Sequence, residues 1–338
     1  MPYTRFDYIS NFMLDSSRQE SFDSREDGSL TLSLVVPVFN EIETVGLFLE
    51  RVTQVFGEMP INLDIVFVND GSSDNTLECL LELQQGNQSV RIIDLSRNFG
   101  KEAALTAGLK AAIGQVVVPI DVDLQDPPEL ILNMLEKWRE GFDVVLGKRF
   151  SRDSDSWVKK KSANWFYRIH NKISTQEIPE NVGDFRLMDR TVVDALNELP
   201  ESCRFMKGLF AWVGFRTATV EYARPERIAG TTKFNGWRLW NFALEGITSF
   251  STDPLRIWTY LGGLIALTSF CFAIFIVLRF LIQGIDLPGY ASIIVSVTFL
   301  GGLQLIGIGV IGEYLGRAYI ESKRRPIYLV RSIYEAKD

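Results

Sequence analysis

The 338-residue sequence contains a single histidine, His170, and only three cysteines, Cys79, Cys203 and Cys271. One histidine argues against a histidine-rich metal centre and against catalysis by a histidine relay. The cysteines show no paired spacing, so we expect neither a disulfide framework nor a zinc site, and the composition fits a reducing compartment.

Two common nucleotide-binding motifs are also missing. No Gly-x-Gly-x-x-Gly follows the first predicted strand, and the chain contains no Gly-x-x-x-x-Gly-Lys-Ser/Thr loop. These absences count against a dinucleotide-binding domain and against a P-loop. The formal net charge of -7 argues against nucleic acid as a partner. The first residues show no secretory signal pattern, so we expect none.

Apolar runs of strand length alternate with helical patterns through residues 30–149. Strands are predicted at 32–38, 63–69, 90–95, 116–120 and 142–146, with helices in the intervals between them. Such alternation with short links predicts an α/β domain with a mostly parallel, doubly wound sheet. Residues 1–29 are polar and without period, and we expect a flexible N-terminal arm there.

The most informative stretch is residues 116–129, where a buried strand ends at Asp121 and Asp123. Residues two apart in extended chain point the same way, so both carboxylates could bind one cation, with Gln125 adding a neutral oxygen. Mg²⁺ and Mn²⁺ prefer oxygen ligands and often bridge to phosphates. The alternative is a turn rich in Asp and Pro that leads into a helix.

Polar residues follow two further strands, as Asn40-Glu41 and as Asp70. Ligands of open α/β sheets bind beyond the carboxyl ends of the strands, so we expect these groups to converge with Asp121 and Asp123. A diphosphate in such an acidic pocket needs a cation between the like charges. A nucleotide diphosphate and a divalent metal therefore form a consistent pair of ligands.

Four segments in order, residues 37–41, 68–74, 96–101 and 121–129, resemble the successive motifs of family-2 glycosyltransferases. The resemblance is strongest to the polyprenyl-phosphate sugar transferases, a branch that includes dolichol-phosphate mannose synthases and bactoprenol glucosyltransferases. It extends over about residues 30–330 and implies the nucleotide-diphospho-sugar transferase fold, called glycosyltransferase-A and Rossmann-like. Asn69 departs from the aspartate that many members carry at that position.

The resemblance also implies roles for individual residues. The metal ligands for Mg²⁺ or Mn²⁺ would be Asp121, Asp123 and Gln125. The donor-binding residues would be Pro37, Phe39, Glu41, Asp70, Lys101 and Asp184. For Asp184, a buried structural pair with Arg186 is an equally open interpretation. The loop 224–234 resembles the family's Arg-x-x-Gly-x-Ser/Thr-Lys segment.

Basic side chains are expected to bind the acceptor phosphate, because guanidinium and ammonium groups suit phosphate oxygens. We assign Arg149, Arg227 and Lys233 to this role, and we name Lys233 with Asp121 and Asp123 as the catalytic residues. Residues 30–232 would form the catalytic domain, and residues 233–254 an amphipathic helix at the membrane surface. A core helix is the alternative for the latter segment.

Two uncharged stretches follow, 22 residues at 257–278 and 26 residues at 287–312. Each can cross a hydrocarbon layer of about 30 Å at about 1.5 Å per residue. We predict a two-helix transmembrane hairpin within residues 255–316, followed by a cytoplasmic tail at 317–338; a buried soluble hairpin is the alternative. Flanking Arg and Lys residues place the catalytic domain on the cytoplasmic side of the membrane, which we expect to be a bacterial inner or plasma membrane. Glycines in the spans suit helix packing within the hairpin or in a homo-oligomer.

A membrane-bound sugar-nucleotide enzyme needs an acceptor that resides in the membrane, and a lipid phosphate meets this need. A phosphate monoester has its second pKa at about 6, so it needs no strong base to attack the sugar. We therefore predict inverting transfer of a hexose, with UDP-glucose favoured, to polyprenyl (undecaprenyl) phosphate. The open alternatives are a GDP-mannose or UDP-aminoarabinose donor, a processive polysaccharide synthase and a non-catalytic membrane-tethered binding protein.

Overall fold

The computed structural model describes residues 30–149, 182–201, 204, 206–223, 289–335 and scattered positions between 258 and 282. Eight strands form one sheet in the order β7-β5-β6-β4-β1-β2-β3-β8. Their bounds are β1 (Leu30–Val38), β2 (Ile61–Asn69), β3 (Val90–Leu95), β4 (Val116–Pro119), β5 (Val144–Arg149), β6 (Val182–Asp189), β7 (Thr217–Tyr222) and β8 (Val330–Tyr334).

The sheet is mixed. Strand β1 is parallel to β2 and β4, and the pairs β2–β3 and β5–β7 are also parallel. Strand β6 runs antiparallel to both β4 and β5, and β8 runs antiparallel to β3. The predicted α/β sheet is thus confirmed for its parallel centre. Strands β6 and β8, which come later in the sequence, run antiparallel to their neighbours.

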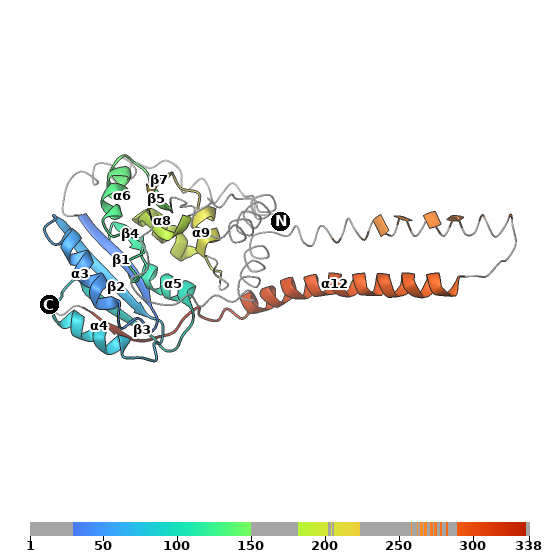
Figure 1. Cartoon of the computed structure of the whole chain (residues 1–338), viewed down its shortest axis with the longest axis horizontal. Helices are drawn as coiled ribbons and strands as arrows, with labels where there is room; N and C mark the ends of the chain where they lie inside the picture. Colours follow the sequence, from blue (N-terminus) through green and yellow to red (C-terminus); the bar gives the residue numbers. More distant parts are fainter. Residues whose placement is uncertain are drawn as a thin grey trace, which may run out of the picture.

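Helices cover both faces of the sheet (Figure 1). The apolar sides of α3 (Val45–Phe56), α4 (Thr76–Gln85) and α6 (Leu130–Arg139) contribute to one core cluster. Those of α5 (Lys101–Ala111), α8 (Arg190–Glu198) and α9 (Met206–Trp212) pack on the opposite face. Burial on both faces explains why the central strands are continuously apolar in sequence.

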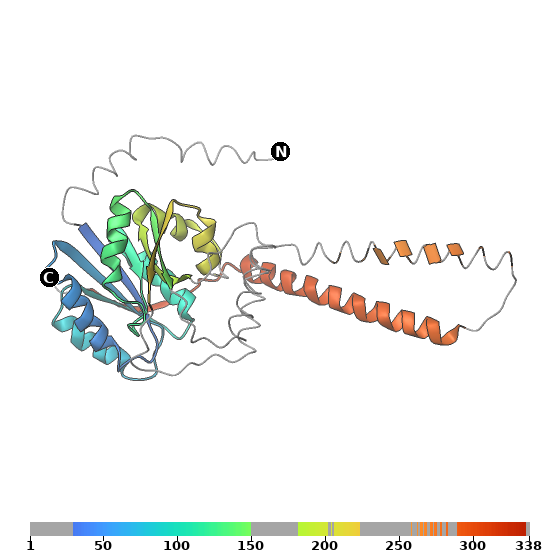
Figure 2. The same cartoon turned by 45° about the horizontal axis from the view of Figure 1, so that its top comes forward.

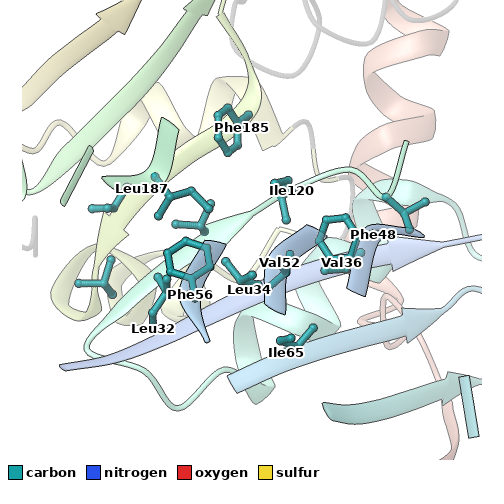
Figure 3. Close-up of a cluster of buried hydrophobic side chains, with 14 of the residues drawn as sticks. Leu32, Leu34, Val36, Phe48, Val52, Phe56, Ile65, Ile120, Phe185 and Leu187 are labelled. Carbon is teal, nitrogen blue, oxygen red and sulfur yellow. The ribbon is translucent and has the colours of Figure 1, made fainter. Parts of the chain in front are cut away.

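The centre of the core is the β1 strand. Leu32, Leu34 and Val36 point to one side and pack with Phe48 and residues of neighbouring strands, as Figure 3 shows. Val35, between them, belongs to the cluster on the other face. Each fully buried aliphatic side chain of this kind contributes about 1.5–3 kcal/mol to folding. The rigid centre fixes the carboxyl ends of β1, β2 and β4, where the predicted site lies.

Helix α12 (Tyr290–Ser322) projects away from the sheet as a straight rod (Figures 1 and 2). Within it, an 18-residue window of Phe299–Ser322 has a mean hydropathy of 1.4 and none of that window is buried, so length and composition allow this helix to cross a membrane. It begins near the start of the predicted second span and continues ten residues past Gly312 to Ser322. In the part of the chain that the structure describes, α12 is the one helix that meets these criteria.

Several predicted segments lie outside the described residues. These are the N-terminal arm at 1–29, the amphipathic helix at 233–254 and half of the positions in the first span at 257–278. The described positions of that first span are helical. The structure therefore establishes one long apolar helix, α12, but it does not establish the predicted hairpin of two helices.

After α12 the chain returns to the sheet. Strand β8 pairs with β3, with Ile333 opposite Ile93 and Ser332 opposite Asp94. The segment 317–338, predicted as a tail, therefore supplies the last helical turns of α12 and an edge strand of the catalytic domain.

Candidate active site

The loops after β1 and β2 are joined by hydrogen bonds between their backbones and short polar side chains. The backbone amide of Asn40 donates to Ser72 Oγ at 3.0 Å, and the backbone amide of Ser73 donates to the side-chain oxygen Asn40 Oδ1 at 2.8 Å. Next to this junction, Thr44 Oγ1 donates to Glu41 Oε2 at 3.0 Å, and Phe39 is 38% exposed. The carboxyl ends of these strands therefore converge, with Pro37 as the penultimate residue of β1.

Asp70 organises the loop that precedes α5. Its carboxylate accepts hydrogen bonds from the amides of Phe99 at 2.7 Å and Gly100 at 2.8 Å. Burial raises the pKa of Asp70 in spite of these amides and of Arg97, which favour the charged form. Gly100 adopts a φ of 99°, which residues with a side chain rarely adopt. Both oxygens of Asp70 are engaged by the loop, so this residue shapes a wall of the site.

The unusual Asn69 has a direct structural partner. Its Nδ2 donates to Asp94 Oδ1 at 2.8 Å, and both side chains are buried at the ends of β2 and β3. An aspartate here would bring two buried carboxylates together, which disfavours their charged forms. The amide at position 69 therefore suits a buried acid at position 94.

Lys101, the first residue of α5, joins acids from two other elements. Its Nζ lies 2.7 Å from Asp121 Oδ1 and 2.9 Å from Asp184 Oδ2. Burial acts to lower the pKa of Lys101, but the two carboxylates outweigh it and hold that pKa above its usual value. Burial likewise opposes ionisation of Asp184, and Lys101 still holds the Asp184 pKa below its ordinary range. The structure thus brings together three of the predicted site residues.

The alternative partner for Asp184, Arg186, is oriented elsewhere. Its guanidinium donates to the carbonyls of Gly183 at 2.8 Å and Asp184 at 3.3 Å, and it lies 3.9 Å from the Phe210 ring centroid. Burial lowers the pKa of Arg186 to about 10. The carboxylate of Asp184 therefore pairs with Lys101 at the site, while Arg186 supports the β6 backbone beneath it.

The residues of the Asp-x-Asp motif fit a hard divalent cation. Asp121 is about one-third exposed, and Asp123 Oδ1 accepts from the Gln125 amide at 3.2 Å. Gln125 Oε1 is buried and has no hydrogen-bond partner in the described part of the chain. Leu124 adopts a φ of 56°, and strained backbone of this kind is concentrated at functional sites.

Among the described residues, no group of three His, Cys, Asp or Glu side chains is close enough to hold a metal on its own. A cation at Asp121 and Asp123 would therefore need further oxygens from outside the protein. Mg²⁺ is commonly bound in this way, through one or two carboxylates and the phosphates of a substrate.

Arg149 is fixed by a second polar cluster. Tyr222 Oη donates to Asp126 Oδ1, and Arg149 Nε donates to Tyr222 Oη at 3.2 Å. Arg149 Nη2 lies 3.5 Å from Asp126 Oδ1, and a Cβ on Gly183 would come within 2.9 Å of the same nitrogen. Burial and the neighbouring Asp126 raise the pKa of Tyr222. The positively charged guanidinium of Arg149 is therefore held in a restricted position on the β5 side of the site.

Some of the site residues were not identified from the sequence. Glu102 is one: its Oε2 accepts from the Met206 amide at 3.3 Å, and burial together with Asp184 raises its pKa to about 7. Asp126 lay inside a motif that was singled out, but Tyr222 carries no local signal. Two of the predicted phosphate-binding residues, Arg227 and Lys233, lie outside the described residues.

Comparison with known proteins identifies the family. Residues 33–196 match the family described as Glycosyl transferase family 2. Over 303 residues the sequence is 54% identical to the bactoprenol glucosyl transferase of Shigella phage SfV, covering 90% of this chain and 99% of that protein. It is 53% identical over 304 residues to the prophage bactoprenol glucosyl transferase homolog of Escherichia coli, with coverages of 90% and 99%.

An uncharacterised glycosyltransferase of Synechocystis is 52% identical over 306 residues, which cover 90% of this chain and 96% of that protein. These relatives cover 90% of the chain, so the similarity extends well beyond the matched residues 33–196. The chain belongs to glycosyl transferase family 2, as its four motifs predict.

Proposed function

We propose that this enzyme transfers glucose from UDP-glucose to a polyprenyl phosphate at the cytoplasmic face of a membrane. The product is a polyprenyl-phosphate-linked glucose, and the reaction requires Mg²⁺ or Mn²⁺. The observation that carries the proposal is the cluster of Lys101, Asp121 and Asp184 at the carboxyl end of the sheet of a family-2 transferase. Relatives over nearly the full length that are named bactoprenol glucosyl transferases support this choice of sugar and acceptor.

The donor nucleotide lies against the converging loops after β1 and β2. Pro37, Phe39 and Glu41 line the base, and Asp70 orders the wall beside it through the amides of Phe99 and Gly100. The diphosphate extends toward Asp121 and Asp123, with Asp184 near the sugar. When bound, the divalent cation supplies positive charge against the leaving diphosphate.

The acceptor phosphate approaches from the side of Arg149. The bond that forms joins a phosphate oxygen to the anomeric carbon, and the bond that breaks joins that carbon to the diphosphate, which leaves with the electron pair. Attack opposite the leaving group inverts the anomeric configuration. Arg149, with Arg227 and Lys233, holds the two phosphates in register, and such orientation accounts for much of the rate enhancement in reactions of this kind.

No protein base is needed, because the attacking phosphate is already largely dianionic near neutral pH. This agrees with the single histidine of the chain, which lies outside the described residues. The acidic groups of the site then serve to bind cations rather than to remove a proton from the acceptor.

The membrane part positions the site beside the lipid acceptor. Helix α12 is about 50 Å long at about 1.5 Å per residue, which exceeds a hydrocarbon layer of about 30 Å. We infer that residues 257–278 form a second span, that residues 233–254 lie at the interface, and that both ends of the hairpin face the cytoplasm. Exposed glycines on α12, such as Gly302, Gly309 and Gly312, suit close helix packing in a homo-oligomer.

The proposal is tested by incubating enriched membranes with a panel of radiolabelled UDP- and GDP-sugars and analysing the organic phase. We expect label from UDP-glucose in a lipid product that mild acid hydrolyses to glucose. A lipid product labelled from GDP-mannose or from a UDP-aminoarabinose sugar would replace the donor assignment. A long polymer would indicate a processive synthase, and no transfer from any donor would indicate a binding protein.

A further inference from the structure

The end of β3, which leads into the site, is held by residues from the opposite end of the sequence. Strand β8 pairs with β3, and the Ser96 amide donates to the Leu329 carbonyl at 2.9 Å. Arg331 donates to the Ser96 carbonyl at 2.8 Å. Leu329, which precedes β8, and Arg331 on β8 therefore bind both backbone polar groups of Ser96, the first residue after β3.

Arg331 also neutralises a buried acid. Its Nη1 lies 3.4 Å from Asp94 Oδ2, and Asp94 is 1% exposed. The other carboxylate oxygen accepts from Asn69, so an amide on β2 and a guanidinium on β8 share this charge. Exposed ion pairs contribute little to stability, but removing the partner of a buried charge leaves that charge uncompensated.

The loop at residues 96–100 is thus fixed from two sides. Asp70 binds the amides of Phe99 and Gly100 from the β2 side, and the C-terminal segment that contains β8 binds Ser96 from the edge of the sheet. Tyr328 packs against the apolar cluster to which Phe99 also contributes. Lys101 follows at once, and its ammonium joins Asp121 and Asp184.

The same C-terminal segment follows directly from α12. Only the seven residues 323–329 separate the end of that helix from β8. Figures 1 and 2 show the chain leaving the base of α12 and running back along the sheet at β3. The wall of the site is therefore connected to the apolar helix by a short segment.

We propose that the C-terminal strand β8 supports the nucleotide-binding site. In this proposal Arg331 is a positioning residue for the loop at residues 96–100, which leads into Lys101. The inference rests on the proposed function for the identity of the donor. Loss of Arg331 frees the Ser96 carbonyl and leaves Asp94 with the Asn69 amide but without its cationic partner, so the loop shifts and the donor binds more weakly. The lipid acceptor, which approaches from the Arg149 side, is unaffected.

The test compares Arg331→Ala, Arg331→Lys and the matched control Arg325→Ala in the full-length protein in detergent. Arg325 is an exposed arginine of the same segment, six residues earlier, and it precedes β8. For each protein we measure the Kd of UDP and of GDP, and the KM of donor and of polyprenyl phosphate. In Arg331→Ala we expect a rise of about fivefold in nucleotide Kd and donor KM, with the acceptor KM unchanged.

Arg331→Lys should recover part of the loss, because it keeps the charge near Asp94 but not the full geometry of the guanidinium. Nucleotide Kd and donor KM equal to those of wild type would overturn the inference. So would a fall in kcat alone with every KM unchanged, since that indicates only a smaller folded fraction. Nucleotide binding separates the two proposals: a wild-type protein that binds GDP instead of UDP overturns the donor assignment, while the Arg331 comparison is still read on the nucleotide that binds.

Discussion

The ammonium of Lys101 lies 2.7 Å from a carboxylate oxygen of Asp121, the first acid of the Asp-x-Asp motif. A side-chain cation therefore already neutralises one of the two acids to which a divalent metal is assigned. A divalent metal held by Asp121 and Asp123 would compete with Lys101 for Asp121, and a bound diphosphate would add negative charge that favours both cations. Lys101 can then turn to Asp184, which it also contacts.

Replacing Lys101 by Met should strengthen the binding of Mn²⁺ in the absence of donor. The ion pair is partly exposed, so its contribution is about 1 kcal/mol and the gain in affinity is up to about fivefold. Electron paramagnetic resonance of free Mn²⁺ measures the affinity directly. Lys101→Arg, which keeps the positive charge, serves as the control and should bind Mn²⁺ as the wild type does. A weaker Mn²⁺ affinity in Lys101→Met would show that the two cations do not compete.

Asp123→Ala should abolish transfer, with a loss of at least about 100-fold in kcat, because the leaving diphosphate loses its metal-bound charge compensation. The protein should remain folded and membrane-bound, since the Asp123 side chain is not part of the apolar core. The labelled-lipid assay measures the rate, and Asp194→Ala on the surface of α8 controls for removal of an exposed acid. Near-normal turnover of Asp123→Ala with divalent ions present would remove the metal role from this residue.

Tyr222→Phe should make the position of the Arg149 side chain less restricted. The change removes the hydroxyl that donates to Asp126 and accepts from Arg149, and a buried acceptor that loses its partner costs about 1–3 kcal/mol of stability. We expect a lower apparent Tm and a higher KM for polyprenyl phosphate, with donor KM little changed. Tyr334→Phe on β8 is the matched control. An unchanged acceptor KM would separate Arg149 from phosphate binding.

Glu102→Gln should alter the pH dependence of stability. Burial raises the folded-state pKa of Glu102 from 4.5 to about 7, so the folded protein binds this proton more tightly than the unfolded chain does. The associated stability is complete below pH 4.5 and is lost as the pH rises to about 7, with a span of at most about 3 kcal/mol. A Gln at this position still accepts from Met206, but it does not ionise.

The Tm difference between Glu102→Gln and wild type should therefore be larger at pH 8 than at pH 5.5. Differential scanning fluorimetry in detergent measures both values. Glu140→Gln, which alters an exposed carboxylate, should show no such trend. A Tm difference that is the same at both pH values would mean that Glu102 titrates normally.

Much of the catalytic domain could be predicted from the sequence because the signals are local. Continuous apolar runs marked β1 to β5, helical periodicity marked α3, and an Ala-rich composition marked α5. The positions of Asp70, Asp121 and Asp123 directly after strands identified the edge of the sheet where the site lies. The long apolar run near the C-terminus likewise predicted α12, since length and composition alone define such a helix.

The partners of individual side chains could not be predicted in this way. Periodicity shows that a residue is buried but not which distant strand lies beside it, so the antiparallel β6 and β8 carried no distinguishing signal. Tyr222 and Asp126 meet across 96 residues, and Arg331 and Ser96 across 235. Such contacts depend on the order of strands in the sheet.

The sequence alone therefore determined the family, the type of fold and the acids that can bind a cation, because each of these depends on residues close together in the chain. Only the tertiary structure decided that Lys101 joins Asp121 to Asp184, that Tyr222 fixes Arg149, and that the C-terminal strand supports the loop before α5. These relationships arise when the sheet closes and brings the ends of non-consecutive strands within hydrogen-bonding distance.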